Sequence, residues 1–431
     1  MRRARRAALI TAAVLLTAVA AVLAATTPWN PLPGRVPGGA VRPDPERDFA
    51  PAELARSAAF DQAITPPAYA GLLVGLLAVG LLGLTPLGAR LLGACTGWTR
   101  RRTLRLVTAV IALTTLLRLV ALPFAVWRES VLRRYGLSVQ TWPSWLLDQL
   151  KSLGLTWVIW TVAALALFAL ARRFPRYWWT GAAVGGFALV VAVSFVYPVV
   201  VEPLFNRFTS LPAGRLRTEL LQMAERDGVP VEDVLVADAS RRTTALNAYV
   251  SGFGSTRRIV VYDTLLSSPP ERIRSIVAHE LGHAKRRDVL HGTLVGALSV
   301  SGCVCLLFLV LTSPRLRRRA GLADDGSDGA DPRQLALLLA AVTVLTQLGG
   351  PVQNLVSRRI EARADAHALN LTRDPATFVS MQRELSIRNL SDLRPDPVEY
   401  ALWFTHPSGP ERIAMARTWA RLNGVPEPRG W

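Results

Sequence analysis

The residues best suited to chemistry in this sequence are "HELGH", at positions 279 to 283. The chain has only 5 histidines in 431 residues, and His279 and His283 stand four apart on either side of Glu280. On a helix this spacing puts both imidazoles on one face, where they can bind the same metal ion. Glu280 would lie about 100° around that helix, where it can take a proton from a metal-bound water without being a ligand. The motif predicts a zinc ion that activates water; the alternative is two histidines at a membrane interface beside a surface glutamate.

A catalytic zinc of this kind needs a third protein ligand. The stretch "SRRIEARAD" offers Glu361 and Asp365, four residues apart on an expected helix. Glu361 would complete the ligand set. Asp365 would accept a hydrogen bond from the other ring nitrogen of a ligand histidine and so fix its tautomer. The alternative is an ordinary helix whose acids balance its own arginines.

The remaining histidines have weaker patterns. His406, in "THPSGPERI", could donate a hydrogen bond to the oxyanion that forms when water attacks a peptide carbonyl. It could equally be a loop histidine that precedes a proline. His291 and His367 have no metal-ligand spacing, and we expect them to be packing or interfacial residues.

The motifs are surrounded by apolar sequence. Hydrophobic residues make up 51% of the chain, and seven segments are long enough to cross a bilayer as helices, which takes about 20 residues each. The first follows "MRRARR" and could instead be a signal peptide. The expected spans are 7–25, 69–94, 106–127, 152–171, 178–201, 289–312 and 335–351.

A less apolar stretch between the fifth and sixth spans carries the HELGH motif. Within it, "AGRLRTELLQMAERDG" predicts an amphipathic helix, and "VEDVLVADAS", "NAYVSGFG" and "RRIVVYDTLL" predict short strands. A helix is expected to start near Pro270, because proline fits a first helical turn. The expected division of the chain is 1–68 for the first span and its loop, 69–205 for spans two to five, 206–288 for a catalytic domain with the zinc-binding helix, 289–351 for spans six and seven, and 352–431 for a C-terminal catalytic part with the third ligand.

The charge favours membranes over nucleic acid. Lys and Arg total 50 against 31 acids, for a net charge of +19. The arginines mostly flank apolar segments instead of forming one patch, which is typical of helices anchored at anionic membrane surfaces. We therefore expect membrane lipids as partners and no nucleic acid. The 3 cysteines lie in apolar stretches and predict no disulfide framework.

The short connections give an orientation. On the side of the N-terminus they hold four, five, three and five arginines, seventeen in all; on the opposite side they hold eight basic residues. By the positive-inside rule the N-terminus is then cytoplasmic, and the HELGH motif lies outside after five crossings.

Several blocks together resemble a known family. They are "YGLSVQTWPSW", "EPLFNRFTSLPAGRLRTEL", "NAYVSGFGSTRRIVVYDTLL", "HELGH", "SRRIEARAD" and "HPSGPERI", in this order, between about Phe60 and Ala416. They resemble the type I CaaX prenyl endopeptidases, integral-membrane zinc metalloproteases, of which this chain looks like a bacterial member. The resemblance implies a mainly α, multi-pass membrane protein. About seven transmembrane helices would enclose a chamber, and a small α+β zinc-metalloprotease domain would cap it.

The resemblance also implies roles for individual residues. One zinc ion per chain would be bound by His279, His283 and Glu361, and Glu280 would be the general base. Asp365 would support a ligand, and His406 would lie near the scissile carbonyl. Asn247, Ala248 and Tyr249 would belong to an edge strand that holds an extended peptide by strand addition, and Arg412 would also bind substrate. Arg118, in the middle of the third span, would face the polar interior of the chamber.

Two residues depart from the family pattern. Ala284 replaces an aromatic residue common after "HELGH", and Gly409 replaces a bulkier residue; neither is a predicted ligand.

The resemblance implies a cell-membrane protein with a cytoplasmic active site, whereas the arginine distribution implies an outside one. The substrate would be a peptide or protein, possibly with a lipidated C-terminus. The alternatives are a quality-control metalloprotease and a non-catalytic scaffold or transporter with a vestigial site. The acidic loop 322–332 has no chemistry that its sequence predicts.

Overall fold

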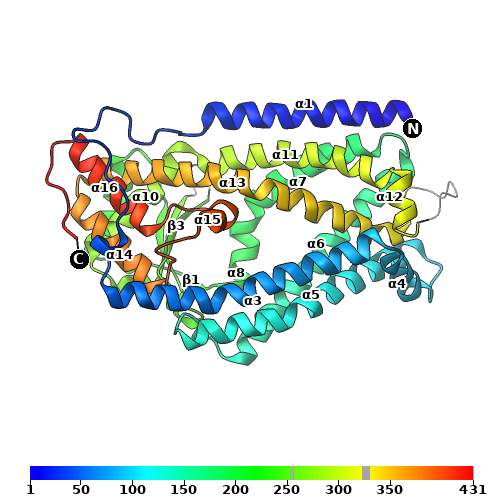
Figure 1. The fold of residues 1–431 in the computed structure, drawn as a ribbon, viewed down its shortest axis with the longest axis horizontal. Helices are drawn as coiled ribbons and strands as arrows, with labels where there is room; N and C mark the ends of the chain where they lie inside the picture. Colours follow the sequence, from blue (N-terminus) through cyan, green and yellow to red (C-terminus); the bar gives the residue numbers. More distant parts are fainter. Residues whose placement is uncertain (253, 255–256, 323–330, 431) are drawn as a thin grey trace.

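The computed structural model is an elongated bundle of helices with a small α/β unit at one end (Figure 1). It describes residues 1–252, 254, 257–322 and 331–430. Within these residues, seven helices are long and apolar enough to cross a membrane, so the expected multi-pass membrane protein is confirmed. The bundle consists of α1 (Arg2–Thr26), α3 (Pro51–Leu84), α5 (Arg102–Arg134), α6 (Trp142–Arg173), α7 (Trp178–Val196), which continues through a π-helical turn (Tyr197–Val201) into α8 (Glu202–Phe205), α11 (Asp288–Leu311) and α13 (Leu335–Thr372).

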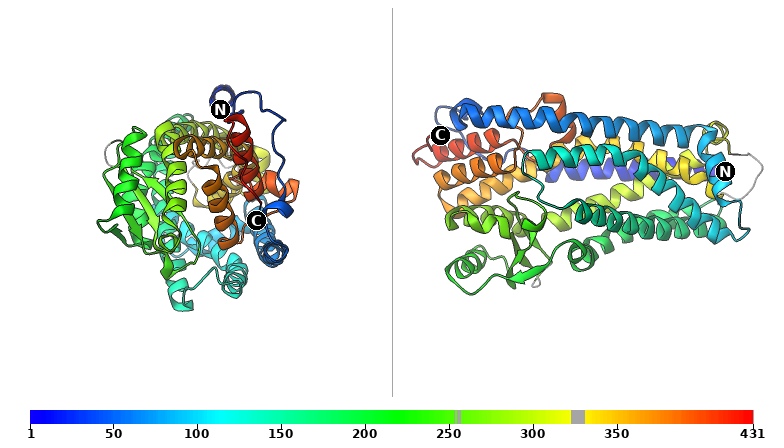
Figure 2. Two further views of the ribbon diagram at one scale, coloured as in Figure 1. Left: turned by 90° about the vertical axis from the view of Figure 1, so that its left-hand side faces the viewer. Right: turned by 90° about the horizontal axis from the view of Figure 1, so that it is seen from below.

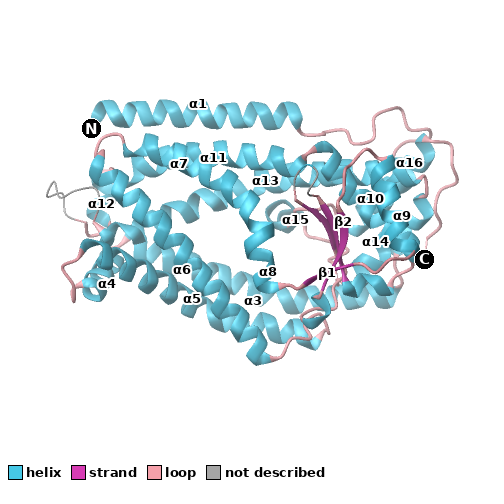
Figure 3. Cartoon of the chain, turned by 180° about the vertical axis from the view of Figure 1, so that it is seen from behind, coloured by secondary structure: helices cyan, strands magenta, loops and turns pink. Residues whose placement is uncertain are grey.

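The other elements are shorter. A four-stranded sheet and the helices α9, α10, α14 and α16 form most of one end of the molecule, which we call the sheet end (Figure 3). The shorter elements are α2 (Pro45–Asp48), α4 (Pro86–Thr96), α9 (Arg215–Arg226), α10 (Pro270–Arg286), α12 (Pro314–Arg319), α14 (Pro375–Arg388), α15 (Pro397–Trp403), α16 (Gly409–Leu422), β1 (Phe208–Ser210), β2 (Asp233–Ala237), β3 (Ala248–Ser251) and β4 (Arg258–Tyr262).

Prolines explain where the second span differs from its expected bounds. α3 begins at Pro51, well before residue 69, and the Glu53 carboxylate accepts a hydrogen bond from the Ala50 N–H (2.8 Å) at its start. It ends at Leu84, because the residue before Pro86 is disfavoured in helical geometry. The chain then starts a separate helix, α4. The expected span 69–94 is therefore wrong at both ends.

The sheet has the order β1-β2-β4-β3, with β2 and β4 parallel and the outer pairs antiparallel. β2, β3 and β4 match the three predicted strands, whereas β1 was not predicted. The sheet packs on α9 and α10 through a core that includes Leu220, Ile259, Val261, Val277 and Leu281, all buried. This core fixes α10, and with it the HELGH motif, against the inner face of the sheet.

Long helices connect the sheet end to the membrane bundle without a break. The expected boundary at 68/69 lies inside α3, and the one at 351/352 lies inside α13. The connection 27–50, which follows α1, runs back along α16 at the sheet end (Figure 1), and its Phe49 is fully buried in the core there. The two termini lie at opposite ends of the bundle (Figure 1 and the right view of Figure 2).

Candidate metal centre

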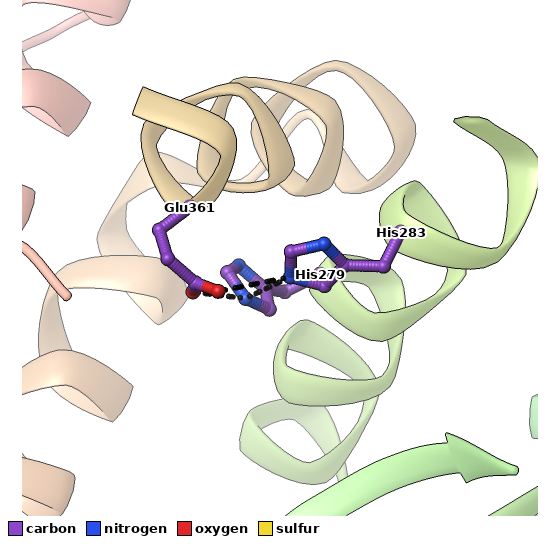
Figure 4. Close-up of side chains that lie close together, drawn as sticks. All are labelled: His279, His283 and Glu361. Carbon is purple, nitrogen blue, oxygen red and sulfur yellow. Dashed lines mark hydrogen bonds and ion pairs between the residues drawn. The ribbon is translucent and has the colours of Figure 1, made fainter. Parts of the chain in front are cut away.

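Three side chains predicted to bind metal converge between α10 and α13 (Figure 4). The Nε2 atoms of His279 and His283 are 3.2 Å apart. Glu361, from the extension of α13 beyond the membrane, places Oε2 3.2 Å from Nε2 of His279 and Oε1 3.4 Å from Nε2 of His283. His279 and Glu361 are buried. The spacing of the motif thus produces the face that the sequence predicted.

The Nδ1 atom of each histidine, on the side of the ring away from the cluster, contacts an aspartate. Nδ1 of His279 is 2.8 Å from Oδ1 of Asp365, as predicted, and Nδ1 of His283 is 2.9 Å from Oδ2 of Asp288. An aspartate partner fixes the proton on Nδ1 and leaves Nε2 as the free lone pair. Asp288 was missed by the sequence reasoning. Arg287 adopts a left-handed conformation (φ 55°) at the end of α10, which turns the chain so that Asp288 reaches back to the histidine.

The aspartates are themselves bonded by arginines. Nε of Arg412 donates to Oδ2 of Asp365 (2.8 Å), and Arg363 donates to Asp288. The Arg412 side chain is 13% exposed. Arg412 was predicted to bind substrate; in the structure its guanidinium is held by Asp365 behind the candidate ligands.

The arrangement fits a metal cation. Because both Nδ1 protons are engaged by aspartates, two Nε2 lone pairs face one another at 3.2 Å. Oε2 of Glu361 points at the same place, is buried, and has no hydrogen-bond partner among the described residues. Three electron-rich atoms in a buried cluster are costly unless a cation lies between them. Two imidazoles and one carboxylate are a donor set typical of catalytic zinc.

Glu280 and His406 lie beside this cluster. Burial raises the pKa of the Glu280 carboxyl. Nε2 of His406 is 3.4 Å from Oε2 of Glu361, and its Nδ1 is 2.9 Å from the hydroxyl of Thr405. Partial desolvation beside the cluster lowers the pKa of the His406 imidazole and favours its neutral form, although 59% of its side chain is exposed. If the Thr405 hydroxyl donates to Nδ1, the proton of the neutral ring is on Nε2, which faces the site.

Two cavities meet at the cluster. The larger, about 1160 Å³, extends towards the membrane helices and is lined by Tyr249 among others; the smaller, about 500 Å³, lies between α10, α14 and α15. Of the described residues, Asn247, His279, Glu280 and His406 line both cavities. An extended chain could therefore pass from one cavity to the other across the cluster.

The predicted edge strand borders this passage. β3 is the last strand of the sheet, and its residues Ala248 to Val250 line the larger cavity together with Asn247, which directly precedes the strand. The carbonyl of Asn247 accepts a hydrogen bond from the N–H of Tyr262 on β4 (3.0 Å). Since backbone groups of an antiparallel strand alternate in direction, Tyr249 also pairs with β4, whereas the N–H and C=O of Ala248 and Val250 point to the open edge.

Comparisons with known proteins decide the family. Residues 210–420 match the model of peptidase family M48, and residues 69–207 match that of the CAAX prenyl protease N-terminal region with five membrane helices. An uncharacterized metalloprotease, YhfN, of Bacillus subtilis is 33% identical over 73% of this chain and 74% of its own length. The chain belongs to peptidase family M48. The predicted membrane metalloprotease is therefore confirmed, and its substrate is a peptide or protein.

Other M48 relatives carry the name of the resembled family. A CAAX prenyl protease 1 homolog of Oryza sativa is 32% identical over 68% of each chain, and CAAX prenyl protease 1 of Saccharomyces cerevisiae is 28% identical over 70% of this chain and 69% of its own. The crystal structure of S. mikatae Ste24p has the same fold, with a TM-score of 0.74 at 22% identity, covering 95% of this chain and 98% of that one.

A further contact locks the two ligand-bearing helices of this M48 protein together. Asp227, which follows α9, is buried. Its carboxylate oxygens lie 2.6 Å from Nζ of Lys285 and 2.9 Å from Nε2 of His367. His367 packs directly on Gly282, where a Cβ atom would come within 3.0 Å of its side chain. His367 is thus a packing residue, as expected; His291 is bonded to Thr26 at the end of α1 (3.0 Å).

Proposed function

We propose that this M48 protein is a zinc-dependent endopeptidase of the cell membrane that cleaves an extended peptide held on β3. The observation that carries the proposal is the pair of Nε2 lone pairs and the orphan Glu361 oxygen that face a single point. His279, His283 and Glu361 would hold the ion. Bound zinc would supply Lewis-acid chemistry, lowering the pKa of water and polarising a carbonyl.

The chain's own residues would do the rest. Glu280 would accept the proton of the attacking water and pass it to the leaving amine; its raised pKa suits a group that must both take and give a proton. Nε2–H of His406 would donate a hydrogen bond to the oxyanion on the substrate. Asn247, Ala248 and Tyr249 border the path of the peptide. Ala248 and Val250 would bond its main chain, a mode that depends little on substrate side chains.

We assign Arg412 a positioning role in addition to its predicted contact with substrate. Its guanidinium fixes Asp365, which fixes His279. A lipidated C-terminus remains the substrate that the family resemblance suggests, and the larger cavity, which reaches the apolar residues Phe195 and Leu290, could receive a lipid chain. Plain and farnesylated forms of one peptide distinguish these two substrates.

The test uses the full-length protein in detergent with Glu280→Gln and His406→Ala variants. Wild type should hold about one zinc per chain and cleave test peptides. Glu280→Gln should keep its zinc and lose cleavage by about 100- to 10,000-fold. His406→Ala should keep its zinc and lose about 100- to 1,000-fold in kcat. A wild-type protein that holds no zinc and cleaves neither peptide form would contradict the proposal.

A further inference from the structure

Most of the positive charge in the short connections between the membrane helices lies at the end of the bundle opposite the metal centre. We call it the arginine end: it consists of segments 1–6, 90–105, 172–176 and 313–333, with four, five, three and five arginines, seventeen in all. Figure 1 shows the N-terminus, α4 and α12 together at this end. Among the residues of these segments that the structure describes, Asp331 is the one acid.

Contacts at the end of α11 bring the first and third segments to the start of the fourth, which follows Thr312. Arg5 donates to the carbonyl of Leu309 (3.2 Å) and to the hydroxyl of Thr312 (2.9 Å). Trp178, two residues after the third segment, packs edge-on against Phe308 with ring centroids 5.4 Å apart. The arginines therefore belong to one face of the folded protein and not only to separate loops of the sequence.

Exposed aromatic residues accompany the arginines. Trp98, within segment 90–105, and Tyr177, directly after segment 172–176, are 68% and 51% exposed. Tryptophan and tyrosine are enriched at the headgroup level of membranes. A face with many arginines and exposed aromatic rings fits a layer of anionic lipid headgroups. The three aspartates of 323–330 lie outside the described residues, and acids count little in setting orientation.

The short connections at the sheet end are different. They contain eight basic residues against the seventeen arginines of the arginine end. Some of the eight are paired with acids in the structure, as Arg333 of the arginine end is with Asp331. Arg133 lies 2.9 Å from Glu129, and Lys151 lies 3.3 Å from Asp148. The other arginines of the sheet end belong to the long folded segments, which have little influence on how a chain inserts.

We propose that the arginine end lies against the anionic headgroups of the cytoplasmic leaflet, so that the metal centre faces the outside of the cell. Seven crossings carry the chain from the arginine end, where it begins, to the sheet end, where it finishes. A cytoplasmic N-terminus then leaves both halves of the metal centre, α10 and the end of α13, on the outer side. This orientation is opposite to the one that the family resemblance implies.

The orientation narrows the substrate class, a step that rests on the proposed function. A protease whose cavities meet on the outer side acts on peptide segments that have already crossed the membrane, such as exported proteins or the outer loops of membrane proteins. The open edge of β3 suits such clients, because strand addition recognises main chain and not one particular sequence.

The test maps cysteine accessibility in intact cells. The native cysteines are Cys95, which is exposed at the arginine end, and Cys303 and Cys305 in α11. One variant carries Gln222→Cys, an exposed position on α9, with all three native cysteines changed to serine. Its matched partner keeps Cys95 alone. Each is treated with a charged, membrane-impermeant maleimide before and after the cells are permeabilised.

The proposal expects the Gln222→Cys variant to be labelled fully in intact cells, with no gain on permeabilisation. Cys95 should be protected from the reagent in intact cells. Labelling of the Gln222→Cys variant only after permeabilisation would place the metal centre in the cytoplasm and overturn the proposal. Because labelling needs no catalysis, this result is independent of whether the protein binds zinc or cleaves peptides.

Discussion

At the scale of single residues, two series of hydrogen bonds support the metal centre, each running from a histidine through an aspartate to an arginine. His279 is bonded to Asp365 and that aspartate to Arg412, while His283 is bonded to Asp288 and the latter to Arg363. The two series come from different elements but perform the same task. Each uses a charged hydrogen bond to fix an aspartate, which in turn fixes the tautomer of one ligand.

These contacts predict the effect of removing either carboxylate charge. Asp288→Asn and Asp365→Asn should each weaken zinc binding by about 10- to 100-fold, because the ligand ring loses its orientation and basicity. The loss should be larger for Asp365, whose side chain is fully buried, than for Asp288, which is 13% exposed. Chelator competition measures the affinity, with Glu232→Gln, at an exposed surface acid, as the control. Unchanged affinity in both variants would show that the aspartates do not support the ligands.

The sequence predicted the ligands because their spacing is periodic. It did not predict the contact of Asp288, because no periodic spacing produces that contact. His279 and His283 share a helix face by arithmetic alone, and so do Glu361 and Asp365. Asp288 reaches its histidine only because the chain reverses at Arg287, a left-handed turn at a residue type that gives no sign of one. Such a contact depends on backbone geometry that no spacing encodes.

At the scale of elements, the centre depends on how closely α10 and α13 approach. Gly282 lies against His367, whose ring is held in place by Asp227. Gly282→Ala should force the helices apart and destabilise the protein by about 1–3 kcal/mol, with weaker zinc binding as the ligands separate. Gly292→Ala on α11 is the control, because an added Cβ meets nothing there within 4 Å. Thermal unfolding and zinc content measure both effects; equal behaviour of the two variants would argue against a close-contact role.

The edge strand gives a prediction about substrate binding alone. Val250→Pro removes an N–H that points to the open edge, so the sheet should keep its pairing while a bound peptide loses a main-chain hydrogen bond. KM should rise about 3- to 10-fold, since one such bond contributes about 0.5–1.5 kcal/mol, with zinc content and melting temperature unchanged. Tyr249→Pro is the matched variant: its N–H pairs with β4, so it should lower the melting temperature instead. If Val250→Pro left KM unaltered, β3 would not be the peptide-binding edge.

Element boundaries show where pattern reasoning succeeds and fails. Apolar runs predicted seven spans because crossing a bilayer requires them. The same runs could not show that α3 begins at Pro51, since its first turns are amphipathic and pack on the sheet end, where Phe60 is buried. β1 was invisible because Phe208–Ser210 is too short to show alternation, and it forms only by pairing with β2.

At the scale of the whole molecule, one helix connects the start of the chain to the metal centre. α16 carries Arg412, which holds Asp365, and also Arg417, which is fully buried and bonded to Asp48 of the 27–50 connection. The carbonyls of Pro428 and Arg429 near the C-terminus complete the surroundings of the Arg417 guanidinium. The connection 27–50 and the residues after α16 thus meet at the Arg417 side chain, on the helix that also carries Arg412.

This contact predicts that a substitution far from the zinc ligands weakens the whole protein. Asp48→Ala leaves the Arg417 charge buried without its partner, which should cost about 3–5 kcal/mol, whereas Glu232→Ala at the exposed pair with Arg258 should cost about 0–1 kcal/mol. Thermal unfolding in detergent compares the two variants. The double variant Asp48→Leu with Arg417→Met, which removes the buried charges together, should recover much of the loss. Because α16 also positions Arg412, the Asp48→Ala protein should release zinc at a lower temperature than wild type. A variant that loses stability equally with and without zinc would instead mean that the 27–50 connection stabilises the fold but does not position the metal centre.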